Sequence, residues 1–73
     1  MKLKRIPTYR IIWGKIRYYQ TIHEIEDTDL AKYLMVGIRT LKDYDKDAKN
    51  LTLEKVDNFL RLNNLEMNDL LSL

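Results

Sequence analysis

Apolar side chains recur at intervals of three and four residues along most of this chain, which is the spacing of one face of an α-helix. The pattern predicts helices over residues 9–21, 27–35 and 38–45, a fourth helix between Thr52 and Asn63, and a last short helical segment containing Met67, Leu70 and Leu71. No stretch alternates apolar and polar residues as a strand does, and no repeat or linker divides the sequence. The predicted fold is therefore all-α, one compact domain of five helices.

Residues that favour caps and turns stand at the predicted helix ends. Pro7 restricts Ile6 to extended geometry, so we expect residues 1–7 to form a flexible basic arm and residues 8–73 to form the folded domain. The side chains expected to cap helix starts are Thr8, either Glu26 or Asp27, and Thr52. Asn63-Asn64 is expected to stop the fourth helix, because asparagine tolerates the left-handed conformation.

The segment 38–45 separates an apolar side from a polar side. Ile38, Leu41 and either Tyr44 or Asp45 follow the helical repeat. The outer positions are Arg39, Thr40, Lys42, Asp43 and Lys46. The third predicted helix is therefore short and polar on its outer side.

Aromatic residues are frequent and occur at helical spacing. They are Trp13, Tyr9, Tyr18, Tyr19, Tyr33 and Tyr44. We interpret them as filling or rimming the core rather than as a surface on which nucleobases stack. His23 follows the first predicted helix and is expected to be a surface residue rather than a base or a ligand.

The composition argues against several kinds of site. The chain has 73 residues, one histidine and no cysteine, which leaves no disulfide and no thiolate or histidine-based zinc site. Asp43, Asp45 and Asp47 alternate along a helix end and a loop rather than converging, which argues against an acid–base pair or a calcium loop. We therefore expect no metal, no cofactor and no enzymatic activity. Without an apolar run of about 18 residues, we also expect a cytoplasmic protein with no membrane partner.

The formal net charge of +2 conceals a gradient along the chain. Residues 1–19 contain no acid and the six cations Lys2, Lys4, Arg5, Arg10, Lys15 and Arg17. The acids Glu24, Glu26, Asp27 and Asp29 follow within a few residues. A basic segment of this kind can approach a phosphate backbone and release its counterions, or it can simply keep a small protein soluble.

Short motifs follow one another without a gap over most of the chain. They are Ile16-Arg17-Tyr18-Tyr19, Leu30-Ala31-Lys32-Tyr33-Leu34, Met35-Val36-Gly37, Ile38 to Asp45, Thr52-Leu53-Glu54 and Leu70-Leu71. In this order they resemble the lambda-repressor and Cro type of helix-turn-helix proteins, and the resemblance covers about Lys15 to Leu71. It implies a small phage or mobile-element regulator that places its third helix in the major groove of a DNA operator, usually as a homodimer.

The resemblance also implies a set of contact residues. Base-reading positions fall on Ile38, Arg39, Thr40 and Asp43, and candidate phosphate contacts on Lys32, Lys42, Lys46 and Lys49. The arm would add Lys2, Lys4 and Arg5, and two copies would join through Leu65, Met67, Leu71 and Leu73. Each of these four sets of residues has a structural alternative. Arg39 can pair with Asp43 within the helix, the lysines can be solvated surface charges, the arm can be disordered, and the leucines can close the core of the monomer.

The chain departs from the family pattern at three places. Asp27 stands where glutamine commonly contacts a phosphate, and Gln20 and Asp45 stand where an arginine–glutamate pair is frequent. Met35-Val36-Gly37 replaces a Gly-Val-Ser corner, which moves the flexible residue. The negative charge of Asp27, Asp43, Asp45 and Asp47 supports a second hypothesis. In it the fold serves a phage-encoded antirepressor or inhibitor that binds the basic surface of another regulator or of a nucleic-acid-handling protein.

Overall fold

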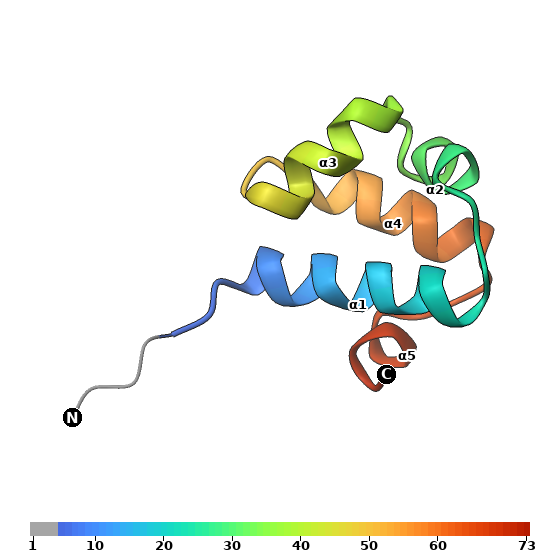
Figure 1. Cartoon of the computed structure of the whole chain (residues 1–73). Coiled ribbons are helices and arrows are strands. Elements are labelled where there is room, and N and C mark those ends of the chain that lie inside the picture. The colour runs from blue at the N-terminus through green and yellow to red at the C-terminus, as the bar shows by residue number, and fades with distance from the viewer. Residues whose placement is uncertain (1–4) are drawn as a thin grey trace.

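Five helices make up the part of the chain that the computed structural model describes, residues 5–73. They are α1 (Thr8–Ile22), α2 (Asp27–Leu34), α3 (Ile38–Lys46), α4 (Leu53–Leu62) and α5 (Met67–Leu71). Residues 5–73 contain no strand, so the prediction of an all-α, five-helix chain is confirmed. In Figure 1, α2, α3 and α4 lie on one side of α1, and α5 lies on the other.

A single apolar core receives at least one fully buried side chain from every helix. These side chains are Ile16 from α1, Leu30 and Leu34 from α2, Leu41 from α3, Phe59 from α4 and Leu70 from α5. Burying a side chain of this size contributes about 1.5–3 kcal/mol each. The core therefore holds together all five helices, including the short α5.

Aromatic rings join helices that are distant in the sequence. The ring of Trp13 meets Tyr44 edge-on with centroids 5.1 Å apart, and Tyr19 meets Phe59 in the same way at 5.7 Å. Edge-to-face pairs of this kind contribute beyond the area they bury. The interpretation of the aromatic residues as core or rim is thus correct except for Tyr18, whose side chain is 52% exposed.

Three helix ends are built in the same way. A residue with a positive φ directly follows α2, at Met35 (60°), and stands two residues after the end of α1 and α4, at Glu24 (52°) and Asn64 (56°). The next amide N–H then bonds a carbonyl five residues earlier: Ile25 to Gln20 at 3.0 Å, Val36 to Ala31 at 2.9 Å and Leu65 to Leu60 at 2.8 Å. The three apolar side chains that follow the left-handed residues pack against the core. Each corner is therefore fixed by a backbone hydrogen bond and a hydrophobic contact.

The corner between α2 and α3 differs from the one expected. Met35 has the left-handed conformation, whereas Gly37 has a φ of −83° and is the N-cap residue of α3. The expectation that the flexible residue had moved to position 37 is therefore wrong. A left-handed non-glycine residue costs about 1–2 kcal/mol, which the burial of Val36 and its backbone bond offset at this corner.

Two of the three predicted helix caps are not made. Thr8 is already helical, and the amides of Arg10 and Ile11 bond the carbonyl of Pro7 instead. No side chain caps α2, where Glu26 is the N-cap residue. The remaining cap is confirmed, since the Thr52 hydroxyl accepts a hydrogen bond from the amide N–H of Lys55 at 3.3 Å.

The helical spacing of Leu53, Val56 and Leu60 predicts that Leu53 lies on the core face of α4, but its side chain is 74% exposed. It is the first residue of the helix, and the buried positions of α4 begin one turn later at Val56. Asn63 and Asn64 end α4 as predicted.

Candidate nucleic-acid interface

The third helix presents one face to the core and the opposite face to solvent. Leu41 is buried as predicted, and of the two alternatives Tyr44 and Asp45 it is Tyr44 that is buried. Ile38, expected on the same side, is 42% exposed because it is the first residue of the helix. At 3.6 residues per turn, the side of α3 away from Leu41 and Tyr44 carries Arg39, Lys42, Asp43 and Lys46, all of them exposed. We call these four residues the outer face of α3. Figure 1 shows α3 at the edge of the bundle.

The four predicted base-reading residues are close together on α3 but differ in exposure. Arg39 and Asp43 belong to its outer face, and Ile38 is 42% exposed at the start of the helix. Thr40 is half-buried, on the edge of the helix beside the core. The structural alternative for Arg39, an ion pair with Asp43, is not formed, since the ion pairs among residues 5–73 are both made by Arg17.

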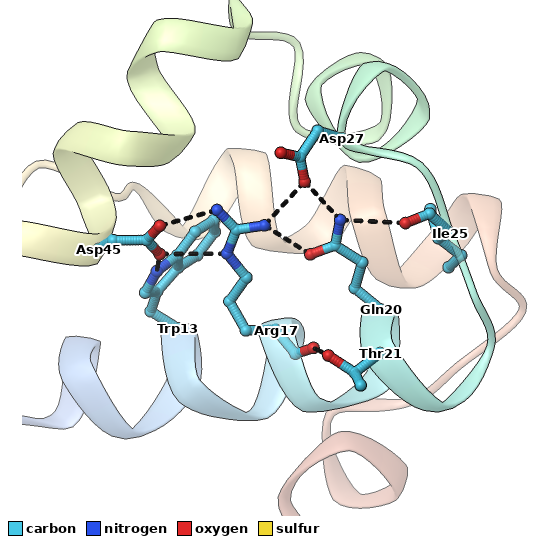
Figure 2. Close-up of polar contacts among 7 residues, drawn as sticks. All are labelled: Trp13, Arg17, Gln20, Thr21, Ile25, Asp27 and Asp45. Carbon is cyan, nitrogen blue, oxygen red and sulfur yellow. Dashed lines mark hydrogen bonds and ion pairs between the residues drawn. The ribbon is translucent and has the colours of Figure 1, made fainter.

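The inner side of α3 is fastened to α1 by the guanidinium group of Arg17. Its Nε and Nη2 atoms donate to the two carboxylate oxygens of Asp45 at 3.1 and 2.8 Å, and Nη1 donates to Asp27 at 2.9 Å (Figure 2). Asp45 lies near the end of α3 and Asp27 begins α2. One side chain of α1 therefore fixes both helices that flank the Met35 corner.

Trp13 and Gln20 complete this network from the same side of α1. The indole N–H of Trp13 donates to Asp45 at 2.8 Å, and the Arg17 guanidinium carbon lies 5.3 Å from the centre of the Trp13 rings. The Gln20 amide accepts from Arg17 at 2.6 Å and donates to Asp27 at 2.7 Å and to the Ile25 carbonyl at 3.0 Å. Gln20 is 93% buried, and these bonds satisfy its polar atoms. We call Trp13, Arg17, Gln20, Asp27 and Asp45 the polar network.

The network favours the charged forms of its members. Hydrogen bonds from Gln20 and then Arg17 lower the pKa of Asp27 below its usual value. Partial burial tends to raise the pKa of Asp45, but the bonds from Arg17 and Trp13 outweigh it and the pKa is lowered. Burial likewise opposes the charge of Arg17, and its two carboxylate partners raise its pKa in spite of it. All three groups are therefore ionised near neutral pH.

This arrangement changes the interpretation of two departures from the family pattern. Asp27 and Asp45 were counted as free negative charges, but both are held by Arg17. Lys42 also lies near enough to lower the pKa of Asp27 through its charge. With Lys42 included, the charges of the network sum to zero. The departure at positions 20 and 45 does not remove an arginine–carboxylate tie between α1 and α3, because Arg17 rather than position 20 supplies the arginine.

No family model, curated protein or solved structure matches this chain.

Two of the four predicted phosphate contacts belong to the outer face of α3, and the other two lie on neighbouring segments. Lys32 lies on α2, Lys42 and Lys46 on α3, and Lys49 in the connection that follows, and all four are exposed. None of them forms an ion pair within residues 5–73. The Asp47 carboxylate accepts from the backbone amide of Lys49 at 3.0 Å, so this acid shapes the connection after α3.

The predicted arm and dimer residues lie elsewhere on the chain. Lys2 and Lys4 are outside the described residues, and Arg5 is exposed ahead of α1. Leu65 and Met67 pack partly against the core of the same copy, which leaves Leu71 and Leu73 as the more exposed pair, at 45% and 38%. A dimer joined at this end would therefore have less apolar surface to bury than the sequence suggested.

Other kinds of site find no support in the geometry. Within residues 5–73, no three histidine, aspartate or glutamate side chains come together as metal ligands would. None of the five helices has both the length and the apolar character needed to cross a membrane. His23 is exposed and stacks on Tyr19 with ring centroids 4.1 Å apart, as expected for a surface residue.

The sequence analysis overlooked the polar network, although the sequence carried a signal for it. Trp13, Arg17 and Gln20 follow one another at intervals of four and three, so they share one side of α1. That side faces α2 and α3. Two of these residues, Arg17 and Gln20, are polar, and polar residues on a side of a helix that faces the core indicate hydrogen-bond partners within the core.

Proposed function

We propose that this chain is a sequence-specific DNA-binding regulator whose α2 and α3 form a helix-turn-helix, with α3 lying in the major groove. One observation carries the proposal: hydrogen bonds from α1 hold the inner side of α3, while its outer face is exposed and forms no ion pair with any of residues 5–73. A reading helix needs both properties, because side chains that discriminate bases must be held in register and remain available. In the lambda-repressor type that the sequence resembles, the corresponding helix does this work.

The charge on α3 supports a nucleic-acid partner. With Asp45 paired to Arg17, the outer face carries three cations, Arg39, Lys42 and Lys46, against the single acid Asp43. Lys32 on α2 and Lys49 in the connection after α3 are further exposed cations. Cations placed around a reading helix can neutralise phosphates and fix its register on the duplex.

Arg39 is the residue to which we assign the strongest base contact. Its fork of N–H donors fits the O6 and N7 atoms of guanine, and Asp43 one turn later can accept from a cytosine amine. Ile38 is exposed enough to pack on a thymine methyl group. Thr40, being half-buried, has the smallest share in this proposed contact surface.

The test is binding of the purified chain to duplex DNA from upstream of its own gene and to a scrambled duplex. Fluorescence anisotropy at two salt concentrations should show tight binding to the first duplex that falls steeply with salt. Arg39→Ala should weaken specific binding by about 1–3 kcal/mol and leave the fold intact. Arg61→Ala on α4, an exposed arginine outside α3, is the matched control and should have no effect on affinity.

Three results would contradict the proposal. Equal affinity for both duplexes would remove sequence specificity, and unchanged affinity in Arg39→Ala would remove Arg39 from the contact surface. Absence of binding to either duplex at low salt would favour the alternative function, a modulator that binds another protein. In that case Asp43 and Asp47 are the two of the four aspartates of this hypothesis that do not pair with Arg17, and Asp43→Lys should then abolish partner binding.

A further inference from the structure

The start of α1 and the end of α3 lie at the same end of the molecule (Figure 1). Side-chain contacts agree with this, since the Trp13 ring meets Tyr44 with centroids 5.1 Å apart and its indole N–H donates to Asp45 at 2.8 Å. α3 ends one residue after Asp45, at Lys46, and the connection to α4 follows. The turn of α1 that precedes Trp13 therefore lies beside the end of α3.

Arg10 stands on this turn, on the side of α1 from which Arg17 reaches α3. The two arginines are seven residues apart, which is about 20° short of two helical turns, so their side chains leave α1 in nearly the same direction. At the rise of an α-helix, Arg10 is about 10 Å nearer the start of α1 than Arg17. Unlike Arg17, Arg10 is exposed and forms no ion pair with any of residues 5–73.

Exposed cations from two segments meet at this end of the molecule. Arg5 and Arg10 line one open hollow at the start of α1, together with Ile6 and Pro7. Lys46 ends α3, and Lys49 lies in the connection that follows. We call Arg5, Arg10, Lys46 and Lys49 the basic end of the molecule.

The cations of the basic end are largely uncompensated. None of the four forms an ion pair within residues 5–73. Asp45, next to Lys46, is already paired with Arg17. Asp47 is the acid within residues 5–10 and 46–49, and its carboxylate accepts a hydrogen bond from the backbone amide of Lys49 at 3.0 Å. Separate cations spread over two segments fit an extended polyanion better than one small anion, because each can neutralise a different phosphate.

We propose that the basic end binds the sugar–phosphate backbone of duplex DNA beside the base pairs that α3 contacts, with Arg10 as a phosphate contact. The proposal rests on the DNA-binding function proposed above and adds to it a contact from α1, which lies outside the helix-turn-helix. Lys46 belongs both to the outer face of α3 and to the basic end, so one duplex can meet both surfaces. Contacts to the backbone fix the position of a protein on DNA without discriminating bases.

The first test compares Arg10→Ala with the unmodified chain on the specific and the scrambled duplex. A phosphate contact contributes to both complexes, so we expect the affinity for each duplex to fall by a similar factor, roughly threefold to tenfold. The slope of log affinity against log salt concentration should become shallower by about one. Arg39→Ala should differ from it by weakening mainly the specific complex. Arg61→Ala, an exposed arginine on α4, is the matched control and should change neither affinity.

A second measurement locates the contact on the DNA. Duplexes in which one phosphate at a time is replaced by an uncharged methylphosphonate are titrated with the unmodified chain and with Arg10→Ala. At the phosphate that Arg10 contacts, the neutral group should weaken binding of the unmodified chain about as much as Arg10→Ala does. It should have no further effect on the variant, because the two changes remove the same interaction.

The outcomes separate this proposal from the function on which it rests. If the unmodified chain binds the specific duplex but Arg10→Ala binds it equally well, the backbone contact is wrong and the role of α3 stands. A loss confined to the specific duplex, or the absence of any phosphate whose effect depends on Arg10, also overturns the contact. If the unmodified chain binds neither duplex, the DNA-binding function fails and this proposal fails with it.

Discussion

The two sides of α3 use similar residue types in opposite ways. On the inner side, the Asp45 carboxylate accepts three hydrogen bonds from Trp13 and Arg17, and its pKa is lowered. On the outer side, Asp43 and Arg39 are one helical turn apart and exposed, yet form no ion pair. The sequence alone does not distinguish the two aspartates. Their position relative to α1 decides which one stabilises the fold and which one is available to a ligand.

This difference predicts that residues for stability and residues for the proposed DNA contact are separable within the nine residues of α3. Substitutions on the inner side of α3 should lower the free energy of unfolding, whereas substitutions on the outer face should change binding alone. The following predictions test this separation, from the largest expected effect to the smallest.

Leu41→Ala should destabilise the domain most. Leu41 is fully buried at the centre of the inner side, and truncation of such a residue costs about 2–5 kcal/mol through lost burial and the cavity left behind. Urea unfolding followed by circular dichroism measures the difference. Lys42→Ala, on the next residue but the outer face, should stay within about 0.5 kcal/mol of the unmodified chain. Similar losses for both would show that the two sides are not separable.

Arg17→Met should lower the free energy of unfolding by about 1–3 kcal/mol, because it leaves Asp27, Asp45 and Gln20 without their shared donor. Methionine keeps most of the aliphatic stem, so the loss reports the polar contacts. The control is Arg10→Met on the same helix, an exposed residue whose replacement should have little effect. If both variants unfold at the same urea concentration, the network contributes nothing measurable.

Met35→Gly should raise the free energy of unfolding by about 0.5–1 kcal/mol. Glycine relieves the strain of the left-handed conformation, but part of this gain is lost because glycine makes the unfolded chain more flexible. Met35 is 51% exposed, so little packing is lost with its side chain. Gly37→Ala tests the other possible position of the flexible residue. A methyl group at position 37 meets no atom within 4 Å, and we expect no destabilisation there. Thermal unfolding of both variants decides the matter, and a large loss in Gly37→Ala would contradict the assigned corner.

Asp45→Asn should have the smallest effect, and one that depends on pH. Because the folded pKa of Asp45 is lowered from its ordinary value of 3.8, its ionised form stabilises the fold above that pH and the benefit is lost as the pH falls through the folded pKa. Half-exposed pairs are screened by water, so we expect an advantage of at most about 1 kcal/mol over Asp45→Asn at pH 6. Urea unfolding at pH 6, 4 and 3 should show this advantage shrinking below pH 4. An advantage that grows with acid would reverse the assigned sign.

Most of the fold could be predicted from the sequence because helical periodicity and helix stops are local signals. The apolar intervals in α2 and α3 and the asparagine pair after α4 determine element type and end with little help from distant residues. The predictions that failed concern single residues at the start of a helix. Thr8 and Leu53 stand at the first residue of a helix, where a shift of one position changes both capping and exposure.

The candidate site was predicted only in part, because its inner half depends on long-range contacts. The exposed residues of α3 follow from its amphipathic pattern, and Arg39 and Lys42 lie where expected. The pairing of Arg17 with Asp45 joins residues 28 apart, and no periodicity reveals which of several aspartates a given arginine will meet. The left-handed Met35 was missed for a related reason: the backbone bond and the burial of Val36 override the preference for glycine.

The three similar helix ends bear on how fast the chain folds. Each is closed by a hydrogen bond between residues five apart, and such short loops close far sooner than distant segments can meet. Successive helices are thus turned toward one another before Arg17 has to find Asp45. Small helical domains rich in local contacts fold in roughly microseconds to milliseconds. The strained residues Met35 and Glu24 therefore stand at corners that form early in folding. Early formation of these corners shortens the search for the native arrangement of the helices.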